Sequence, residues 1–398
     1  MGTERVKVEL QMRIDDLIEK CMEAPEIKEE RCSFGRKLRL EQGADSGFIH
    51  FLPLFPGITL AYIRIQALSW PAPKLYSEGE PRNSAKIPCS PSQTPSLPAK
   101  AKVSTGKTIA SASDHAPEAQ ANNRAEDTSK TAPSQLPFAS LKGPLLINYC
   151  VTGRCELLLN TDNYVYIQPG EISLTESFAS NQYLYPGKIY EGMEFFIDLD
   201  SVSADAPWLA EEFGLKLSAL TSRYCPSLTT YIAAANKEAD LIFRKLWSIY
   251  DVENPRCLQQ IKVYSLSLLA SLVNAPVIAP ADRHTFYTKY QVEIAKKAEQ
   301  ILTSDLGQHH PAHELAAAFS ISETSLKNYF RGVYGENISS YMLKKRMEKA
   351  GELLLDTAVP VSAIALQTGY SSQSKFAAVF RKYYGTAPLE YRRRSRLG

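Results

Sequence analysis

The feature that most constrains this chain is a repeat near its C-terminus, in which the same residues return at the same spacing. Residues 330–335 read Phe-Arg-Gly-Val-Tyr-Gly, and Tyr341 follows six residues after the glycine. Residues 380–385 read Phe-Arg-Lys-Tyr-Tyr-Gly, with Tyr391 at the same distance. The copies lie fifty residues apart, so the chain is expected to fold one small unit twice.

A short apolar helix pattern precedes each copy and contains a small residue, Ala316 or Ala365. A small side chain lets two short helices cross closely. The turn that follows favours a residue tolerant of positive φ, which Gly369 is, whereas Ser320 at the matching place carries a small cost. Each unit is therefore predicted to be a helix-turn-helix.

The second helix of each unit should begin after a serine N-cap, Ser322 in the first unit and Ser371 in the second. These predicted recognition helices span residues 323–333 and 372–383. Two apolar residues four apart mark the packed face of each helix, and a glycine ends it. The apolar pairs are Leu326 with Phe330 and Phe376 with Phe380, and the glycines are Gly335 and Gly385.

Between the units, apolar residues recur at intervals of four, three and four, which predicts an amphipathic linker helix of nearly five turns. They are Leu343, Met347, Ala350 and Leu354. Pro360 then stops this helix and starts the second unit.

The second unit, residues 361–393, resembles the signature of the AraC/XylS family of bacterial transcription regulators almost position for position. The resemblance covers about a quarter of the chain, and two units in this order make it specific. It departs at Ser320, where glycine is commoner, and at Ala387, where threonine is often seen. It implies double-stranded DNA as a partner, a role as an activator with RNA polymerase as a further partner, and an N-terminal cupin-like barrel that binds a small-molecule effector.

The charge distribution agrees with a nucleic-acid module attached to another domain. Residues 289–398 carry 16 Lys and Arg against 10 Asp and Glu, whereas residues 1–288 carry 29 against 33. The seven cysteines are odd in number and scattered, which indicates a reducing compartment. No signal peptide opens the sequence, and the longest apolar stretch, residues 266–273, is too short to span a membrane. These observations predict a cytoplasmic, nucleoid-associated protein with no membrane partner.

The N-terminal half is rich in short β-branched and aromatic runs divided by turn residues, which predicts strands. The runs are residues 48–57, 58–70, 145–151, 155–159, 164–168, 172–175 and 192–199. Hairpins at this rhythm predict a small antiparallel barrel or sandwich. With the cupin-like barrel that the resemblance implies, the predicted fold class is α+β: this barrel and a helical pair, followed by an all-α double helix-turn-helix.

The predicted domains follow from changes of composition. Residues 1–45 are a leader, for which one amphipathic helix and poor order stay open, and residues 46–275 are the barrel with its helical segment. Residues 77–136 have no Phe, Tyr or Trp, and 32 of these 60 are Ser, Thr, Pro or Ala, which predicts a disordered insertion. Residues 276–288 are a linker, and residues 289–398 bind DNA.

Two further helices are predicted at residues 231–250 and 255–273, where apolar residues recur at three and four. They would form a homodimer contact, as the resemblance implies, or simply close the barrel.

A catalytic barrel is not favoured, because metal-dependent cupin enzymes need imidazole ligands and the main run of strands contains no histidine. His309, His310 and His313 are interrupted by Pro311, so exposed imidazoles at a helix start are favoured over a metal site. No cofactor, metal or catalytic residue is predicted. Four residues could face an effector pocket, although ordinary barrel packing explains them as well: Tyr149, Arg154, Tyr164 and Tyr166.

The recognition helices would enter successive major grooves about 34 Å apart. The candidates for base contacts lie away from the packed faces: Thr324, Lys327, Asn328, Gln373, Ser374, Lys375 and Ala378. The candidates for phosphate contacts are Arg331, Arg381, Lys382, Arg392, Arg393 and Arg394. The alternatives left open are a repressor, an effector-independent regulator, and a sensor that acts through protein contacts without specific DNA binding.

Overall fold

The computed structural model describes residues 14–43, 45–68, 70, 144–158, 163–176, 184–226, 230–276, 286–355 and 358–394. All of them belong to one compact part of the chain, which consists of residues 1–76 and 140–398. The expected insertion at residues 77–136 and most of the expected linker at 276–288 lie outside the described residues.

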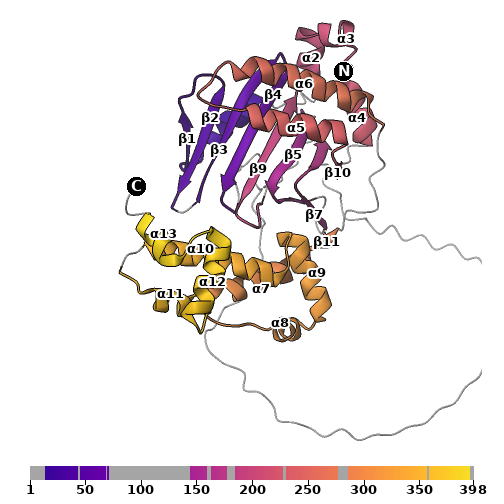
Figure 1. The fold of residues 1–398 in the computed structure, drawn as a ribbon. Helices are drawn as coiled ribbons and strands as arrows, with labels where there is room; N and C mark the ends of the chain where they lie inside the picture. The colour runs from indigo at the N-terminus through magenta and orange to yellow at the C-terminus, as the bar shows by residue number, and fades with distance from the viewer. Residues whose placement is uncertain are drawn as a thin grey trace, which may run out of the picture. The chain divides into compact units, whose positions relative to one another are not determined.

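Eight antiparallel strands form one sheet in the order β1-β2-β3-β4-β9-β5-β8-β10 (Figure 1). The strands are β1 (Ile27–Glu30), β2 (Arg36–Gln42), β3 (Asp45–Phe55), β4 (Ile58–Gln66), β5 (Leu145–Gly153), β8 (Glu171–Thr175), β9 (Tyr190–Ile197) and β10 (Tyr231–Ala234). Within the described residues the sheet is open, because its end strands β1 and β10 do not pair with each other. The mixed α and β class is confirmed, but the closed cupin-like barrel is not.

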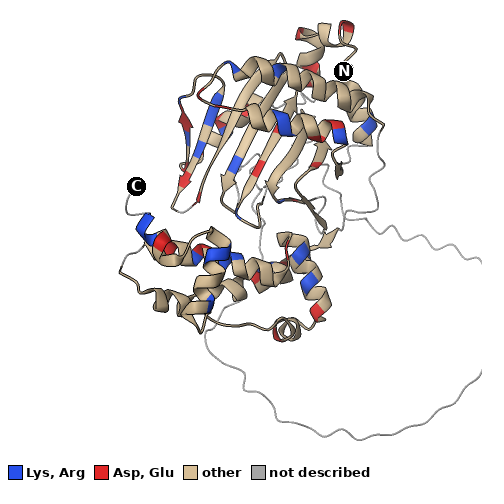
Figure 2. Ribbon diagram, viewed as in Figure 1, with Lys and Arg blue, Asp and Glu red and all other residues tan. Residues whose placement is uncertain are grey.

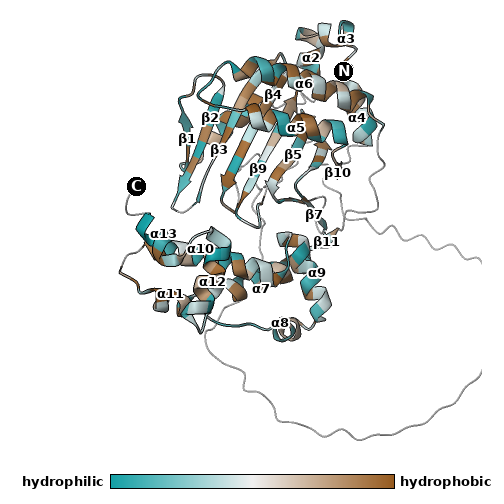
Figure 3. Cartoon of the chain, viewed as in Figure 1, coloured by the Kyte–Doolittle hydropathy of each residue, from teal (hydrophilic) through white to brown (hydrophobic). Residues whose placement is uncertain are grey.

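Two helices, α5 (Lys237–Ile249) and α6 (Cys257–Asn274), cover one face of this sheet (Figure 1). Tyr149 of β5 stacks on Phe243 of α5 with ring centroids 4.2 Å apart, and its hydroxyl donates to Asp240 at 2.6 Å. Figure 3 shows hydrophobic segments alternating with hydrophilic ones along α5 and α6, the pattern that a half-buried helix requires.

The helix expected at residues 231–250 begins only at Lys237. Tyr231 and Ile232 are β-prone, and the strand β10 to which they belong pairs with β8. Asn236 then caps α5 by accepting a hydrogen bond from Ala239 N at 2.9 Å. Local propensity therefore divides a stretch that apolar periodicity alone had assigned to one helix.

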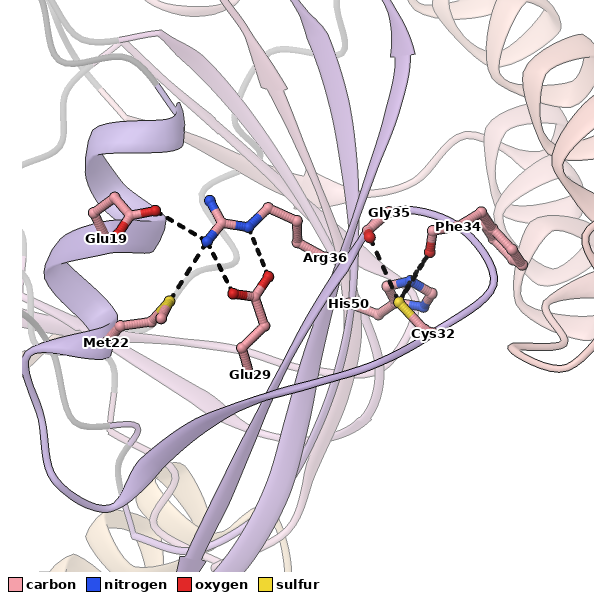
Figure 4. Close-up of polar contacts among 8 residues, drawn as sticks. All are labelled: Glu19, Met22, Glu29, Cys32, Phe34, Gly35, Arg36 and His50. Carbon is pink, nitrogen blue, oxygen red and sulfur yellow. Dashed lines mark hydrogen bonds and ion pairs between the residues drawn. The ribbon is translucent and has the colours of Figure 1, made fainter.

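The N-terminal segment forms α1 (Ile14–Met22), β1 and β2, joined by Arg36 (Figure 4). The Arg36 guanidinium donates to Glu29 of β1 at 2.8 Å and to Glu19 of α1 at 3.0 Å. Its hydrogen bond lowers the pKa of Glu29. The sequence analysis missed both strands because charged residues dominate them, although the alternation of buried Leu38 and Leu40 with polar residues was a usable signal.

A second sheet has the order β11-β7-β6, with β6 (Cys155–Leu158), β7 (Asn163–Ile167) and β11 (Tyr287–Thr288). Three short helices connect β9 to β10: α2 (Leu199–Asp205), α3 (Trp208–Glu211) and α4 (Ser218–Tyr224).

The C-terminal part is helical: α7 (Lys289–Ser304), α8 (Ala312–Ala318), α9 (Glu323–Tyr334), α10 (Ile338–Leu355), α11 (Val361–Gln367), α12 (Gln373–Tyr384) and α13 (Pro388–Arg394). Among the helices the structure describes, none has the length and apolar character needed to cross a membrane.

Candidate nucleic-acid interface

Each C-terminal unit packs three aromatic rings at its centre. They are Phe330, Tyr334 and Tyr341 in the first unit and Phe380, Tyr384 and Tyr391 in the second. The centroid distances are 4.6, 5.3 and 5.0 Å in the first unit and, in the same order, 4.6, 5.4 and 4.9 Å in the second. The repeated spacing in the sequence thus folds into one geometry twice.

The small and large apolar residues of each unit lie where the repeat predicts. Ala316 and Ala365 are buried at the start of each unit, in α8 and α11. The apolar residues that mark the packed faces of α9 and α12 are fully buried: Leu326, Phe330, Phe376 and Phe380. Each unit therefore has a core of its own.

The turns between the paired helices also match. Ser320 has a φ of 56° and Gly369 a φ of 83°, so both occupy the left-handed region. An amide closes each turn, Ile321 N to Ala316 O at 3.0 Å and Tyr370 N to Ala365 O at 2.8 Å. The predicted small cost at Ser320 follows, because a side chain disfavours this region and glycine does not.

The second helix of each unit begins at a serine, but not at both of the serines predicted. Ser322 caps α9 by accepting from Ser325 N at 3.1 Å. Ser372 caps α12 by accepting from Lys375 N at 3.4 Å, so the prediction of Ser371 is wrong by one residue. The second turn contains one more residue than the first, and that residue precedes the cap rather than following it.

The linker helix α10 has 18 residues and serves both cores. Met347, Ala350 and Leu354 are buried in the second core, as predicted, but Leu343 is 41% exposed. Met342 is buried in the first core instead. At about 100° per residue, the packed face turns by about 140° between residues 342 and 347, which a search for one continuous stripe could not detect.

The predicted base-contact residues are all exposed on α9 and α12: Thr324, Lys327, Asn328, Gln373, Ser374, Lys375 and Ala378. Lys327 pairs with Glu323 at 2.6 Å, and both side chains are largely exposed. Such a pair contributes little stability and can exchange for another partner. Figure 2 shows Lys and Arg on α9 and on α13, and the side chains of Lys327, Arg331 and Arg393 on these helices are exposed.

Comparison with known proteins matches this part of the chain. A family model described as a helix-turn-helix domain matches residues 315–394. The xylose operon regulatory protein of Escherichia coli K12 is 37% identical over 75 residues, which are 19% of this chain and 19% of that protein. Residues 315–394 thus form an AraC-type helix-turn-helix domain.

Two further proteins are similar to this chain. The transcriptional regulator GadX of Escherichia coli O127:H6 is 24% identical over 257 residues, 64% of this chain and 88% of that protein. The solved C-terminal domain of AraT from Geobacillus stearothermophilus is 33% identical over 25% of this chain and 84% of that chain, with a TM-score of 0.24. The chain spans only 19% of the length of the xylose regulator, so that protein's activity as a whole does not transfer by identity alone.

The predicted phosphate-contact residues of this AraC-type domain divide into two groups. Arg331, Arg381, Lys382, Arg393 and Arg394 are exposed. Arg394 pairs with Glu390 at 2.6 Å, whereas Arg392 donates to the carbonyls of Leu354 at 3.2 Å and Val359 at 2.5 Å. Arg392 thus ties α13 to the end of α10, and this structural role competes with any contact to DNA.

Gly332 lies in the interior of α9, where glycine costs about 1 kcal/mol relative to alanine. The reason is contact on the buried side of the helix. A Cβ added at Gly332 would collide with the ring of Tyr287, and the Gly332 carbonyl accepts a hydrogen bond from Arg154. The matching residue of the second unit is Lys382, which is exposed.

The structure does not bring the four effector-pocket candidates together. Tyr149 is buried under α5, as described above. Tyr166 donates to Glu156 at 2.7 Å, and Lys296 of α7 pairs with the same carboxylate at 2.9 Å. Tyr166, Tyr164 and Arg154 thus contact residues of α7, α9 or β11 rather than facing a shared cavity with Tyr149.

Cys32 and His50 form a pair that the sequence analysis did not identify, with Sγ and Nε2 3.5 Å apart (Figure 4). The pair lacks the chemistry of a catalytic dyad. The Phe34 carbonyl oxygen lies 2.7 Å from His50 Nε2, and the Tyr250 hydroxyl lies 2.8 Å from His50 Nδ1. Because a carbonyl can only accept, Nε2 carries the proton and cannot take one from the thiol. Burial also raises the pKa of Cys32, which disfavours the thiolate.

Within the described residues, no cluster of three or more His, Cys, Asp or Glu could hold a metal ion.

Proposed function

We propose that this protein is a sequence-specific DNA-binding transcription regulator whose recognition helices are α9 and α12. The observation that supports this most directly is the matched geometry of two helix-turn-helix units on one rigid helix. The linker helix α10 has 18 residues, which at about 1.5 Å per residue extend about 27 Å. A rigid spacer of this length is compatible with two helices that enter successive major grooves about 34 Å apart.

The exposed faces of α9 and α12 offer groups that can read base edges. Asn328 and Gln373 can form two hydrogen bonds to adenine, and Lys327 and Lys375 can reach the acceptors of guanine. The exposed residues Arg331, Arg381, Lys382 and Arg393 are proposed to contact phosphates, which adds affinity and salt dependence but little sequence preference.

The N-terminal sheet and its helices are proposed to sense a small molecule and to control the DNA-binding domain. Contact of Tyr166 and Arg154 with the C-terminal helices supports this, because a shift in the position of β6 or β7 would move the residues that pack against α9. We propose a homodimer through α5 and α6, as the family resemblance implies, with the exposed side chains of Leu241 on α5 and Val263 on α6 available to such a contact. Activation through RNA polymerase is favoured over repression by the family resemblance.

The test is selection of binding sequences from random DNA by the full chain, repeated across a salt series. We expect an enriched sequence with two half-sites about one helical turn apart and an affinity that falls steeply with salt. The double variant Lys327→Ala, Lys375→Ala should change the enriched sequence, whereas Lys216→Ala, at an exposed lysine outside the C-terminal helices, should not. Salt-sensitive binding with no enriched sequence would indicate an architectural protein, and no binding would leave the rival sensor that acts through protein contacts.

A further inference from the structure

A groove with a volume of about 980 Å³ lies between α9 and the N-terminal half of α10. Lys327, Asn328 and Arg331 of α9 line one side, and Ser339, Ser340 and Arg346 of α10 line the other. Tyr370, from the turn of the second unit, also reaches it. The groove thus begins at the first recognition helix and ends at the second unit.

The chemistry of this groove favours an anion. Its lining includes three permanent cations and no Asp or Glu among its described residues. Glu323, just outside, pairs with Lys327 in an exposed ion pair that a phosphate can replace. Arg331 is exposed on the groove side, where its guanidinium can offer paired donors to phosphate oxygens.

His310 gives a separate indication of an absent ligand. Its Nε2 atom is buried at the groove and has no hydrogen-bond partner among the described residues. A buried polar atom without a partner costs free energy, which a ligand able to accept or donate a hydrogen bond would recover. The prediction of exposed imidazoles holds for His309 and His313, whereas this nitrogen of His310 is buried.

The wall formed by Arg346 is held by the loop after α7 and lies against the turn of the second unit. Its guanidinium donates to the carbonyls of Leu306 at 3.0 Å and Gln308 at 3.3 Å, which fixes the loop that carries His309 and His310. A Cβ added at Gly369 would lie 2.8 Å from Arg346 Cζ, so the glycine of the second turn leaves room for this side chain. The groove is therefore a preformed junction between the two units, not an incidental gap.

We infer that this groove binds a backbone phosphate of the DNA strand that passes between the two major-groove segments. The inference rests on the proposed function and adds a third point of contact, between the two recognition helices. Ser339 and Ser340 supply hydroxyl donors in the first turn of α10, where the helix also favours negative charge. The exposed side chain of Leu343 supplies an apolar surface for the adjacent deoxyribose.

A double variant tests the assignment without weakening the helix. Ser339→Asp with Ser340→Asp places two carboxylates in the groove, and acidic residues in a first helical turn stabilise it. We expect affinity for the selected operator to fall about tenfold or more, and the dependence of log affinity on log salt to fall by about one unit. The selected sequence should not change, because a phosphate contact carries no base preference.

Two controls accompany it. Ser218→Asp makes the same change at the exposed first residue of α4, outside the C-terminal helices, and should leave operator affinity unchanged. Arg331→Gln removes one groove cation. It should lower operator affinity and salt dependence as the double variant does, but by less. It also keeps the test valid should the double variant fail to fold.

Methylphosphonate substitution of single operator phosphates locates the contact. For the parent protein, one neutral linkage between the half-sites should weaken binding about tenfold, and for the double variant the same linkage should have no further effect. Unchanged affinity and salt dependence in both groove variants would overturn the inference, while the proposed function would stand if Lys327→Ala with Lys375→Ala still changed the selected sequence. Failure of the parent protein to select any operator would overturn both.

Titration of the full chain with inorganic phosphate distinguishes DNA from a free anion. Thermal stabilisation of the parent but not of the double variant, with operator affinity equal in the two, would assign the groove to a small phosphorylated ligand and overturn the DNA assignment.

Discussion

The two helix-turn-helix units agree on the inside and differ at their edges. The centroid distances within their aromatic triads nearly coincide, and their turns use the same left-handed residue position. They differ at residue 332, where the first unit has a glycine packed against Tyr287 and the second has the exposed Lys382. They also differ at the left-handed turn residue, which is Ser320 in one and Gly369 in the other.

The difference indicates that the two units share one packing of the core but contact different neighbours on the outside of the second helix. The inner face is fixed by packing, since both units must present a recognition helix in the same way. The back of α9 is shaped by contact with Tyr287 and Arg154, whereas α12 has no such demand at Lys382. Under the proposed function, a change in the N-terminal part would therefore act on the first unit more directly than on the second.

The largest expected effect tests whether the cores are equivalent. Phe330 and Phe380 are fully buried rings of the same triad geometry. Phe330→Ala and Phe380→Ala should therefore each lower the free energy of unfolding by about 3–5 kcal/mol. Urea denaturation of the full chain measures this, with Leu389→Ala, at a side chain 64% exposed, as a control that should change little. If only one of the two phenylalanine variants lost stability, the two cores would share their geometry but not their contribution to the free energy of unfolding.

The turns should respond in opposite directions. Gly369→Ala puts a Cβ in the left-handed region and 2.8 Å from the Leu306 carbonyl oxygen. Its backbone strain alone should destabilise the protein by about 1–2 kcal/mol. Ser320→Gly relieves the same strain at an exposed site and should stabilise by up to about 1 kcal/mol. Thermal melts of the two variants decide the matter, and stabilisation by both, or destabilisation by both, would contradict this account of the turns.

Gly332→Ala sharpens the comparison between the backs of the two helices. Alanine improves helix propensity by about 1 kcal/mol. Its Cβ would nevertheless collide with the Tyr287 ring, so a net loss of about 1–2 kcal/mol is expected. In a Tyr287→Ala background the same substitution should become stabilising, which a double-mutant cycle measures. Lys382→Ala at the matching position should be nearly neutral, and an equal loss there would remove the asymmetry.

Sequence reasoning could predict the C-terminal domain because its information is local and repeated. The spacing of Phe330, Gly335 and Tyr341 fixes a triad that needs no distant partner, and the same spacing fifty residues later corroborates it. The prediction that Leu343 is packed was wrong because α10 packs against the two cores with different sides of the helix. The groove could not be predicted from the sequence either, because Arg346, His310 and Tyr370 come together only when both units are folded.

The N-terminal part was predicted less well for a related reason. Sheet order and closure depend on pairings between residues far apart, such as Leu145 with Ile197, which local patterns do not encode. The strand Tyr231–Ala234 runs directly into a helix, so its apolar residues continued the helical period. Tyr149 and Tyr166 are separated because their strands belong to different sheets, β5 to the larger one and β7 to the smaller one, and local alternation does not assign a strand to a sheet.

The smallest expected effect concerns the caps and separates two adjacent serines. Ser322 and Ser372 each supply an oxygen that accepts from a free helical amide, so Ser322→Ala and Ser372→Ala should each cost about 1 kcal/mol. Ser371→Ala should cost much less, because the structure gives the capping contact to its neighbour. Thermal melts of the three variants measure the difference, and a larger loss at Ser371 than at Ser372 would return the cap to the residue that the aligned repeat predicts. That outcome would also remove the extra residue from the turn and place it in the first turn of the second recognition helix.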